Sequence, residues 1–271
     1  MTAHHPRGTF AKRLPCATAL QREIAGLTHA RAALGTAAVP MIVDYDPGSL
    51  TLVLSFVEGR RLADAGSGSQ QNLFDAGSAL RALHDHPATD DARAGLGAEW
   101  RLGGPAADER WEVPPGVAES IQHDLAVLRA LPSAPVTFTH GDYQPRNWLL
   151  TAAGELVVLD FEHAMLGPRY RDFARLEYYF FPAADPALRT AFYSGYGRLP
   201  SASEIDALKL RRRYHAASVI SWARRHAAPD YEQIGWKLLT SEPSSLVADD
   251  SIAGLKSYGD EGYPSPDDLT A

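Results

Sequence analysis

The sequence predicts an α+β fold built as two lobes: a small mixed lobe over residues 1–59 and a mainly helical lobe over residues 60–271. Short runs with strand-like character dominate the first sixty residues. Long segments with apolar residues at helical spacing dominate after residue 70. A pair of strand-like runs between residues 136 and 160 interrupts these helices. The boundary is expected near Gly59, where glycine frees the chain to leave the last strand.

The small lobe begins with a half-buried strand over residues 9–14, where apolar and charged residues alternate. A helix is expected over residues 17–34, with Leu20, Ile24 and Leu27 near helical spacing. Cys16 precedes that helix and is expected to be a small buried residue. Two apolar runs around an Asp-Pro-Gly turn predict a β-hairpin, with strands over residues 39–43 and 50–57.

The large lobe is expected to be a series of helices around one strand pair. The turn before the third helix is assigned to Gly167-Pro168, and Ser203 with Asp206 is expected to start a later helix. An irregular insertion separates the first two helices. The helices are predicted over residues 73–83, 117–131, 169–181, 186–196, 203–226 and 231–246.

Composition narrows the class of protein. The net charge of 26 − 33 = −7 argues against a nucleic-acid partner and permits a cationic one. The single cysteine excludes an internal disulfide and fits a reducing compartment. No run reaches the roughly 18–20 apolar residues of a membrane span, and no apolar segment of a secretory signal follows the N-terminus. The sequence therefore predicts a cytoplasmic protein without a membrane partner.

The most informative stretch is residues 136–163. An apolar strand-like run leads into a polar loop that contains His140, Asp142 and Asn147. A hairpin around Ala153-Gly154 then returns the chain, so that a second strand over residues 156–159 ends on Asp160. Three oxygen-bearing side chains are thereby expected at one edge.

Phosphoryl transfer requires this set of side chains. It needs a carboxylate beside the attacking hydroxyl, and Mg²⁺ prefers carboxylate or amide oxygens together with phosphate and water. Asp142 fits the first role, and Asn147 with Asp160 fits the second. Glu162 is either a further ligand on the metal side or a solvated carboxylate. A metal-dependent phosphohydrolase with His140, Asp142 and Asp160 as ligands is a rival that lacks the additional His/Asp cluster of two-metal sites.

The pattern His-Gly-Asp-x-x-x-x-Asn, followed across a hairpin by Asp-Phe-Glu, resembles the aminoglycoside phosphotransferase and choline-kinase-like family. The resemblance implies a protein-kinase-like fold, with Asp142 as the catalytic base and with Asn147 and Asp160 as Mg²⁺ ligands. It also implies that His140 supports the loop and that Asp172 braces it. A favourable contact with a helix macrodipole is the competing explanation for Asp172.

The resemblance extends to the nucleotide site. A lysine on a strand and a glutamate on the following helix form the ion pair that holds the α- and β-phosphates, which indicates Lys12 and Glu23. Arg13 and Arg22 are rivals, each one residue away. The segment from Ser55 to Gly59 resembles the inter-lobe hinge, in which the backbone of Ser55 and Val57 would bind adenine; a plain strand end is the alternative.

The chain also departs from the family. Relatives place two strands and a glycine-containing phosphate loop before the lysine strand, but only eleven residues precede Lys12, with Gly8 as their sole glycine. Either the small lobe is truncated or the sequence starts late. The expected function is an ATP- and Mg²⁺-dependent phosphotransferase that acts on a hydroxyl of a small polar, cationic acceptor, which the resemblance implies to be an aminoglycoside-like antibiotic or a related metabolite. A degenerate kinase that binds a ligand without transfer is the alternative.

Acceptor contacts are expected in the insertion 92–116 and in the helices after residue 172. Glu177 and Asp185 are candidate acidic contacts there.

Overall fold

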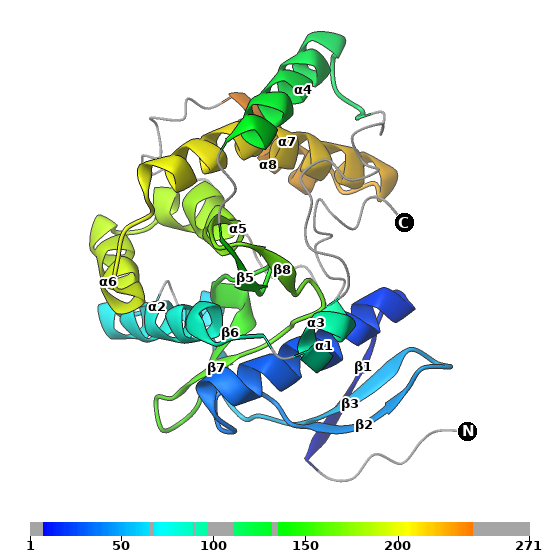
Figure 1. Cartoon of the computed structure of the whole chain (residues 1–271), viewed down its shortest axis with the longest axis vertical. Coiled ribbons are helices and arrows are strands. Elements are labelled where there is room, and N and C mark those ends of the chain that lie inside the picture. Colours follow the sequence, from blue (N-terminus) through cyan, green and yellow to red (C-terminus); the bar gives the residue numbers. More distant parts are fainter. Residues whose placement is uncertain (1–7, 66–67, 89, 97–110, 132–134, 241–271) are drawn as a thin grey trace. The chain divides into compact units, whose positions relative to one another are not determined.

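The computed structural model describes residues 8–65, 68–88, 90–96, 111–131 and 135–240 (Figure 1). The chain divides into two compact units. Unit 1 comprises Met1–Trp100, Pro135–Asp172 and Ala184–Leu199. Unit 2 comprises Arg101–Ala134, Phe173–Ala183 and Pro200–Ala271. The candidate catalytic, metal and nucleotide-binding residues all belong to unit 1, whereas the acceptor candidate Glu177 belongs to unit 2. The predicted division into lobes at Gly59 differs from these two units, and it stays a prediction.

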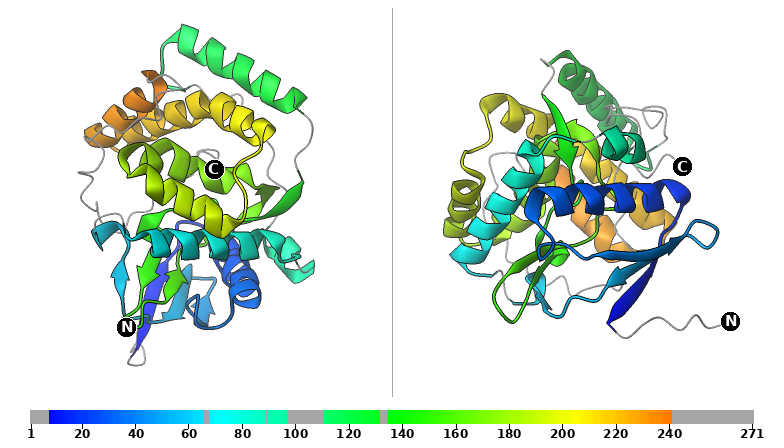
Figure 2. Two further views of the ribbon diagram at one scale, coloured as in Figure 1. Left: turned by 90° about the vertical axis from the view of Figure 1, so that its left-hand side faces the viewer. Right: turned by 60° about the horizontal axis from the view of Figure 1, so that its bottom comes forward.

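Unit 1 begins with a three-stranded antiparallel sheet of order β1-β3-β2, formed by β1 (Thr9–Arg13), β3 (Thr51–Ser55) and β2 (Ile42–Asp46). Helix α1 (Ala17–Leu34) has the predicted bounds and lies alongside the sheet (Figures 1 and 2). Strand β2 begins three residues later than predicted. Before β2, the Ala38 carbonyl accepts a hydrogen bond from the Val158 amide at 2.9 Å, while the Met41 carbonyl still accepts one from the Ser55 amide of β3.

The prediction that Cys16 is buried is wrong. Cys16 is exposed and is the N-cap residue of α1, with extended backbone. An N-cap residue stands before the first helical turn, so its side chain need not follow the buried stripe of the helix.

Two short antiparallel strand pairs carry the polar loop. Strand β5 (Val136–Thr139) pairs antiparallel with β8 (Met165–Pro168), and β6 (Trp148–Leu150) pairs with β7 (Leu156–Val158). The short β4 (Arg60–Arg61) lies on the other side of β6. The expected turn at Gly167-Pro168 is wrong, because both residues belong to β8. Pro168 stands at the strand end opposite Val136, where a residue without an amide hydrogen is tolerated.

The helices of unit 1 pack through small residues. Helix α2 (Gln70–Asp85) lies against α6 (Pro186–Tyr196), and a Cβ on Gly77 or Gly195 would strike the facing backbone. Helix α3 (Asp90–Leu96) packs on α1, with Gly95 facing Ala25. Two 3₁₀ turns, Ala63–Ala65 and Pro145–Asn147, complete the unit.

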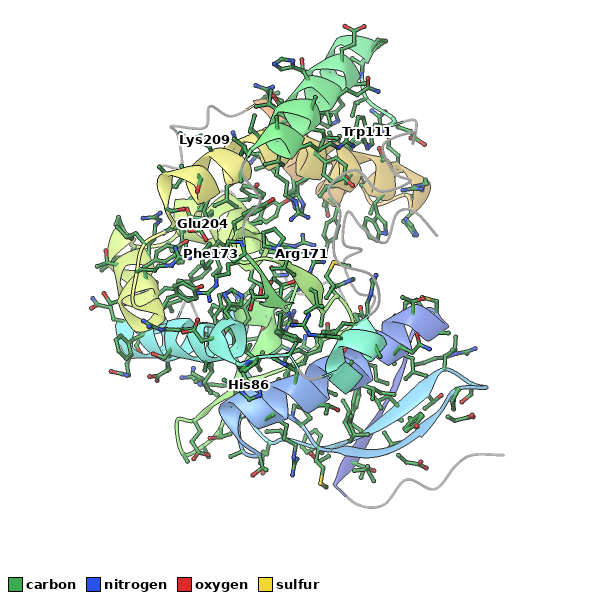
Figure 3. The ribbon with its side chains drawn as sticks, viewed as in Figure 1. His86, Trp111, Arg171, Phe173, Glu204 and Lys209 are labelled. Atoms are coloured by element: carbon green, nitrogen blue, oxygen red, sulfur yellow. The ribbon has the colours of Figure 1, made fainter. Side chains whose placement is uncertain are left out.

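Helix α5 (Tyr170–Arg175) runs from unit 1 into unit 2 and continues as a π-helical segment, Leu176–Phe180, and a 3₁₀ turn, Phe181–Ala183. Unit 2 also contains α4 (Pro115–Ala130), α7 (Ala202–Arg225) and α8 (Pro229–Thr240). Trp111, labelled in Figure 3, is buried with residues of α4 and α7. The predicted α8 residues 241–246, like insertion residues 97–110, lie outside the described residues.

The predicted cap of α7 at Ser203 is wrong by two residues, and the helix itself begins one residue earlier than predicted, at Ala202. Ser201 is the N-cap, and its hydroxyl accepts from the Glu204 amide while the Glu204 carboxylate accepts from the Ser201 amide. Ser203 and Asp206 have the same spacing, but a glutamate side chain reaches back to an N-cap amide more easily than the shorter aspartate.

Across the part of the chain that the structure describes, no helix combines the length and the apolar character needed to cross a membrane.

Candidate active site

The polar loop that follows β5 depends on a glycine. Gly141 has φ of 83°, in the left-handed region that glycine tolerates best. A Cβ there would also collide with the His163 carbonyl and with the guanidinium of Arg171. Arg171, labelled in Figure 3, donates to the Thr139 hydroxyl at 3.0 Å and to the His163 carbonyl at 3.1 Å. The close approach of these segments therefore fixes the start of the loop.

Asp142 is held by three donors from its own loop. Its side chain is only 1% exposed. Its Oδ1 accepts from Gln144 Nε2 at 2.5 Å, and its Oδ2 accepts from Arg146 Nη2 at 2.7 Å and from Asn147 Nδ2 at 2.8 Å. Buried carboxylates are tolerated when they are hydrogen-bonded and paired with charge, and this one has both kinds of partner.

Asn147 connects the loop to the end of β7. Its Nδ2 donates to the Asp142 carbonyl at 2.9 Å as well as to the carboxylate, so its Oδ1 is the side-chain atom that can ligate a cation. Its backbone carbonyl accepts from the Leu159 amide at 2.9 Å, which places Asn147 beside the residue before Asp160. Asp160 has φ of 67°, unusual for a residue with a side chain.

The structure brings Lys12 and Glu23 together and adds two more carboxylates. Lys12 Nζ lies 3.3 Å from Glu23 Oε2, 2.5 Å from Asp160 Oδ1 and 3.1 Å from Glu162 Oε2. Lys12, and not its neighbour Arg13, therefore reaches the cluster. Glu162 is buried and ion-paired, so the alternative that it is a solvated carboxylate is wrong.

Charge in this cluster is unbalanced, since one ammonium faces three carboxylates. Burial lowers the pKa of Lys12, but the three carboxylates raise it more, so Lys12 stays charged. Burial raises the pKa of Glu23 to about 7, against the opposing effect of Lys12. Burial also raises the pKa of Asp160, but the charge and hydrogen bond of Lys12 bring it below its usual value. The side-chain ligand atoms of Glu23, Asp160 and Glu162 lie within 4.8 Å of one another, a donor set that suits a hard divalent cation.

His140 is a buried support of the loop. Its Nδ1 accepts from the Asp142 amide at 3.2 Å, so Nε2 carries the proton and donates to the Leu159 carbonyl at 2.9 Å. Burial lowers the pKa of His140, which keeps the ring neutral. The ring thus links the loop to the residue before Asp160.

Asp172 holds the backbone of the same loop. Its Oδ2 accepts from the His140 amide at 2.8 Å and its Oδ1 from the Gly141 amide at 2.6 Å. His84 Nε2 lies 2.9 Å from Oδ2, and His84 Nδ1 lies 2.8 Å from the Tyr196 hydroxyl. Burial raises the pKa of the Asp172 carboxyl, but the hydrogen bond and charge of His84 bring it below its usual value. These contacts support a bracing role over a macrodipole effect.

The hinge candidates lie at the end of β3, in the same sheet as Lys12. The Ser55 amide donates to the Met41 carbonyl at 2.8 Å, and the next amide, that of Phe56, donates to the Gly8 carbonyl at 2.7 Å. The Ser55 amide is therefore occupied, and Val57 is the first hinge candidate whose amide has no hydrogen-bond partner within the described ranges.

Sequence analysis missed three of these partners. Gln144 and Arg146 lie between the two motif residues but belong to no named pattern. His84 is 88 residues from Asp172, so only the fold reveals their contact. Of the acceptor candidates, Asp185 caps α6 through the Ala187 amide at 2.8 Å, and Glu177 is buried.

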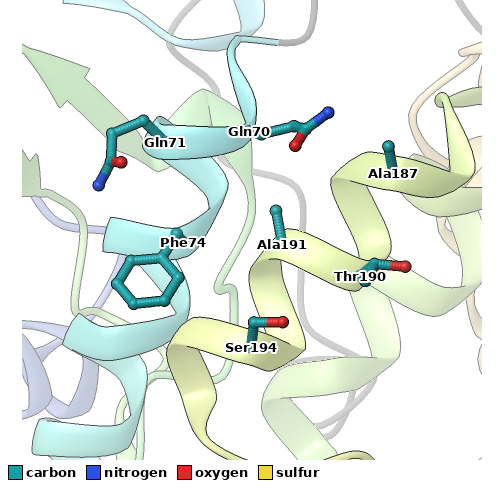
Figure 4. A pocket seen from close by; sticks show the side chains of 7 residues that line it. All are labelled: Gln70, Gln71, Phe74, Ala187, Thr190, Ala191 and Ser194. Carbon is teal, nitrogen blue, oxygen red and sulfur yellow. The ribbon is translucent and has the colours of Figure 1, made fainter.

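A surface pocket of about 470 Å³ lies between α2 and α6, lined by Gln70, Gln71, Phe74, Ala187, Thr190, Ala191 and Ser194 (Figure 4). It contains none of the residues that carry the chemistry described above.

Fold and site together define a small-molecule kinase: a protein-kinase-like α+β chain with an acid, an amide and a lysine-paired acid on adjoining loops. The chain matches the phosphotransferase enzyme family over residues 7–214. It therefore belongs to that family, which confirms the predicted family, fold class and enzyme class.

Solved structures share the fold at low sequence identity. The GDP and kanamycin complex of APH(2")-IIia has a TM-score of 0.63 and 16% identity, over 82% of this chain and 81% of that one. A choline/ethanolamine kinase family protein from Mesorhizobium loti has a TM-score of 0.61 and 16% identity, over 84% and 82%. The AMP-bound spectinomycin phosphotransferase APH(9)-Ia has a TM-score of 0.61 and 13% identity, over 92% and 88%. The search of curated proteins returned no match.

Proposed function

We propose that this kinase transfers the γ-phosphoryl group of ATP to a hydroxyl of a small, polar, cationic acceptor. The observation that carries the proposal is the convergence of Asp142, Asn147 and Asp160 through the Asn147–Leu159 hydrogen bond, with Lys12 paired to Asp160 and Glu23. This is the donor set that phosphoryl transfer uses for positioning and charge neutralisation.

The residues fit Mg²⁺. Asp160 and the Oδ1 of Asn147 would hold the ion, with Glu162 as a further carboxylate. Bound there, the ion would neutralise charge on the nucleotide phosphates. Lys12 would exchange its contacts with Asp160 and Glu162 for contacts with the α- and β-phosphates. The Glu23 carboxylate would hold the Lys12 side chain in place during this exchange.

Asp142 acts on the acceptor. Its carboxylate accepts a hydrogen bond from the acceptor hydroxyl and aims the oxygen at the γ-phosphorus. As the new O–P bond forms, the bond to the bridging oxygen of ADP breaks and the hydroxyl proton passes to Asp142. Most of the rate gain comes from orientation, since the protein forms no covalent bond with either reactant. The backbone of Ser55 and Val57 is the proposed adenine contact.

The acceptor class rests on charge and on the relatives. The chain carries a net charge of −7, which favours cationic ligands. One relative was solved with kanamycin and another is named for spectinomycin. We extend this class to the present chain, with ATP as the donor and the cytoplasm as the place of action.

The test is a product assay by mass spectrometry. The protein is incubated with Mg²⁺ and either ATP or GTP, together with a panel of hydroxylated cationic compounds. Acceptor-dependent product that requires ATP, disappears in Asp142→Asn and persists in Asp206→Asn supports the proposal. Asp206 is a matched control because its side chain is 61% exposed on α7. Nucleotide binding without product from any acceptor would favour a degenerate kinase instead.

A further inference from the structure

Asp142 combines deep burial with a negative charge. Its side chain is 1% exposed, and two of its three loop donors, Gln144 and Asn147, are neutral amides. Neutral donors satisfy lone pairs but do not balance charge, and an ionised carboxylate away from water is costly without a cation. A cationic donor is therefore expected beside the Asp142 carboxylate, where it also fixes the direction of that carboxylate.

Arg146 supplies that cation. Its Nη2 lies 2.7 Å from Asp142 Oδ2, a short charge-assisted contact, and its own side chain remains 33% exposed. It stands four residues after Asp142 in the turn Pro145–Asn147, where Pro145 fixes the backbone. The contact differs from an ion pair between two exposed side chains, which contributes little to stability, because one partner here is buried.

We propose that Arg146 is a positioning residue for Asp142: its guanidinium holds the buried carboxylate in the orientation that faces the acceptor hydroxyl. The catalytic role of Arg146 rests on the proposed function. The ion pair itself can be tested by denaturation, which needs no enzymatic turnover. Arg146 acts through Asp142, so its removal is expected to slow transfer and to leave nucleotide binding intact.

The ion pair is tested by a double-mutant cycle in urea denaturation. Arg146→Gln removes the charge and leaves an unbalanced carboxylate, so its unfolding midpoint is expected below that of the unchanged protein. Adding Asp142→Asn removes the charge that needs a partner, so the double variant is expected to unfold at a higher urea concentration than Arg146→Gln alone. If the midpoint shift of the double variant equals the sum of the shifts of the two single variants, the proposed pairing is overturned.

The catalytic purpose is tested by separating turnover from binding. In Arg146→Gln, kcat with the acceptor from the product assay is expected to fall about 10- to 100-fold, while the Kd for Mg²⁺-ADP stays within about twofold. Arg146→Lys, which keeps the charge, is expected to recover part of the loss. Arg169→Gln is the matched control, since Arg169 is 30% exposed and lies 2.8 Å from the Asp85 carboxylate on the surface. It is expected to behave as the unchanged protein.

Three outcomes would overturn this role. Arg146→Gln could keep full kcat, it could lose Mg²⁺-ADP affinity by the same factor as kcat, or Arg169→Gln could lose as much kcat as Arg146→Gln. If the unchanged protein forms no product with any acceptor, the proposed function fails, and the denaturation cycle still decides whether Arg146 holds Asp142.

Discussion

Gly26 controls how closely α1 approaches the segment that carries Asp160. A Cβ at this position would lie 2.6 Å from Phe161 Cβ and 3.0 Å from Ala164 Cβ. Because carbon atoms in contact normally lie about 3.5–4.0 Å apart, Gly26→Ala would displace α1 by about 1 Å. Glu23 precedes Gly26 by one turn of the same helix, so its present 3.3 Å contact with Lys12 would lengthen beyond ion-pair range.

The two consequences differ in size. Overpacking costs about 1–3 kcal/mol, and alanine returns about 1 kcal/mol through its better helix propensity. The net loss of stability is therefore about 1 kcal/mol, a decrease in Tm of a few degrees. A 1 Å displacement of the phosphate-binding pair is expected to lower kcat/KM for ATP by about 10- to 100-fold. Activity should fall much more than stability.

Steady-state kinetics with varied ATP and thermal unfolding of the same samples measure both effects. Gly116→Ala is the matched control, because Gly116 also lies in a helix and a Cβ there meets no atom within 4 Å. It is expected to keep full activity. Wild-type kcat/KM for ATP in Gly26→Ala would refute the argument that this close contact sets the Lys12–Glu23 geometry.

Three further predictions concern the catalytic loop and its metal. Asp172→Asn removes the charge that holds the His140 and Gly141 amides, and it is expected to lower stability by about 3 kcal/mol in urea denaturation; a change below about 1 kcal/mol would contradict the bracing role. Burial lowers the pKa of His140 below 6.5, so the native state binds fewer protons than the unfolded chain. The resulting stability is complete above pH 6.5 and is lost as the pH falls, so stability measured between pH 6.5 and 5 should fall less steeply in His140→Gln; equal slopes would contradict this. Chelation by EDTA is expected to abolish transfer, with recovery on adding Mg²⁺; undiminished turnover in EDTA would exclude the metal role.

Local patterns predicted the parts of the site that are local in sequence. The bounds of α1 follow from apolar spacing, and the five-residue step from Asp142 to Asn147 places both in one loop. The hairpin that ends at Asp160 follows from two short apolar runs around Gly154. In each case the residues that interact lie within a few positions of one another or in adjacent strands.

Non-local pairing set the limit of prediction. Strand β8, Met-Leu-Gly-Pro, contains two residues typical of turns, and it becomes a strand because β5, about thirty residues earlier, supplies the hydrogen bonds. His84 reaches Asp172 only because α2 packs beside the loop. The choice of Ser201 over Ser203 depends on side-chain reach, which a shared spacing does not reveal.

The most direct test of the account is a crystal structure of the protein with Mg²⁺ and a non-hydrolysable ATP analogue. The account predicts a magnesium ion about 2.1 Å from a carboxylate oxygen of Asp160 and from Oδ1 of Asn147, with Lys12 on the phosphates and Asp142 facing the γ-phosphoryl group. An ion held away from both ligands, or a nucleotide bound in the pocket between α2 and α6, would contradict it.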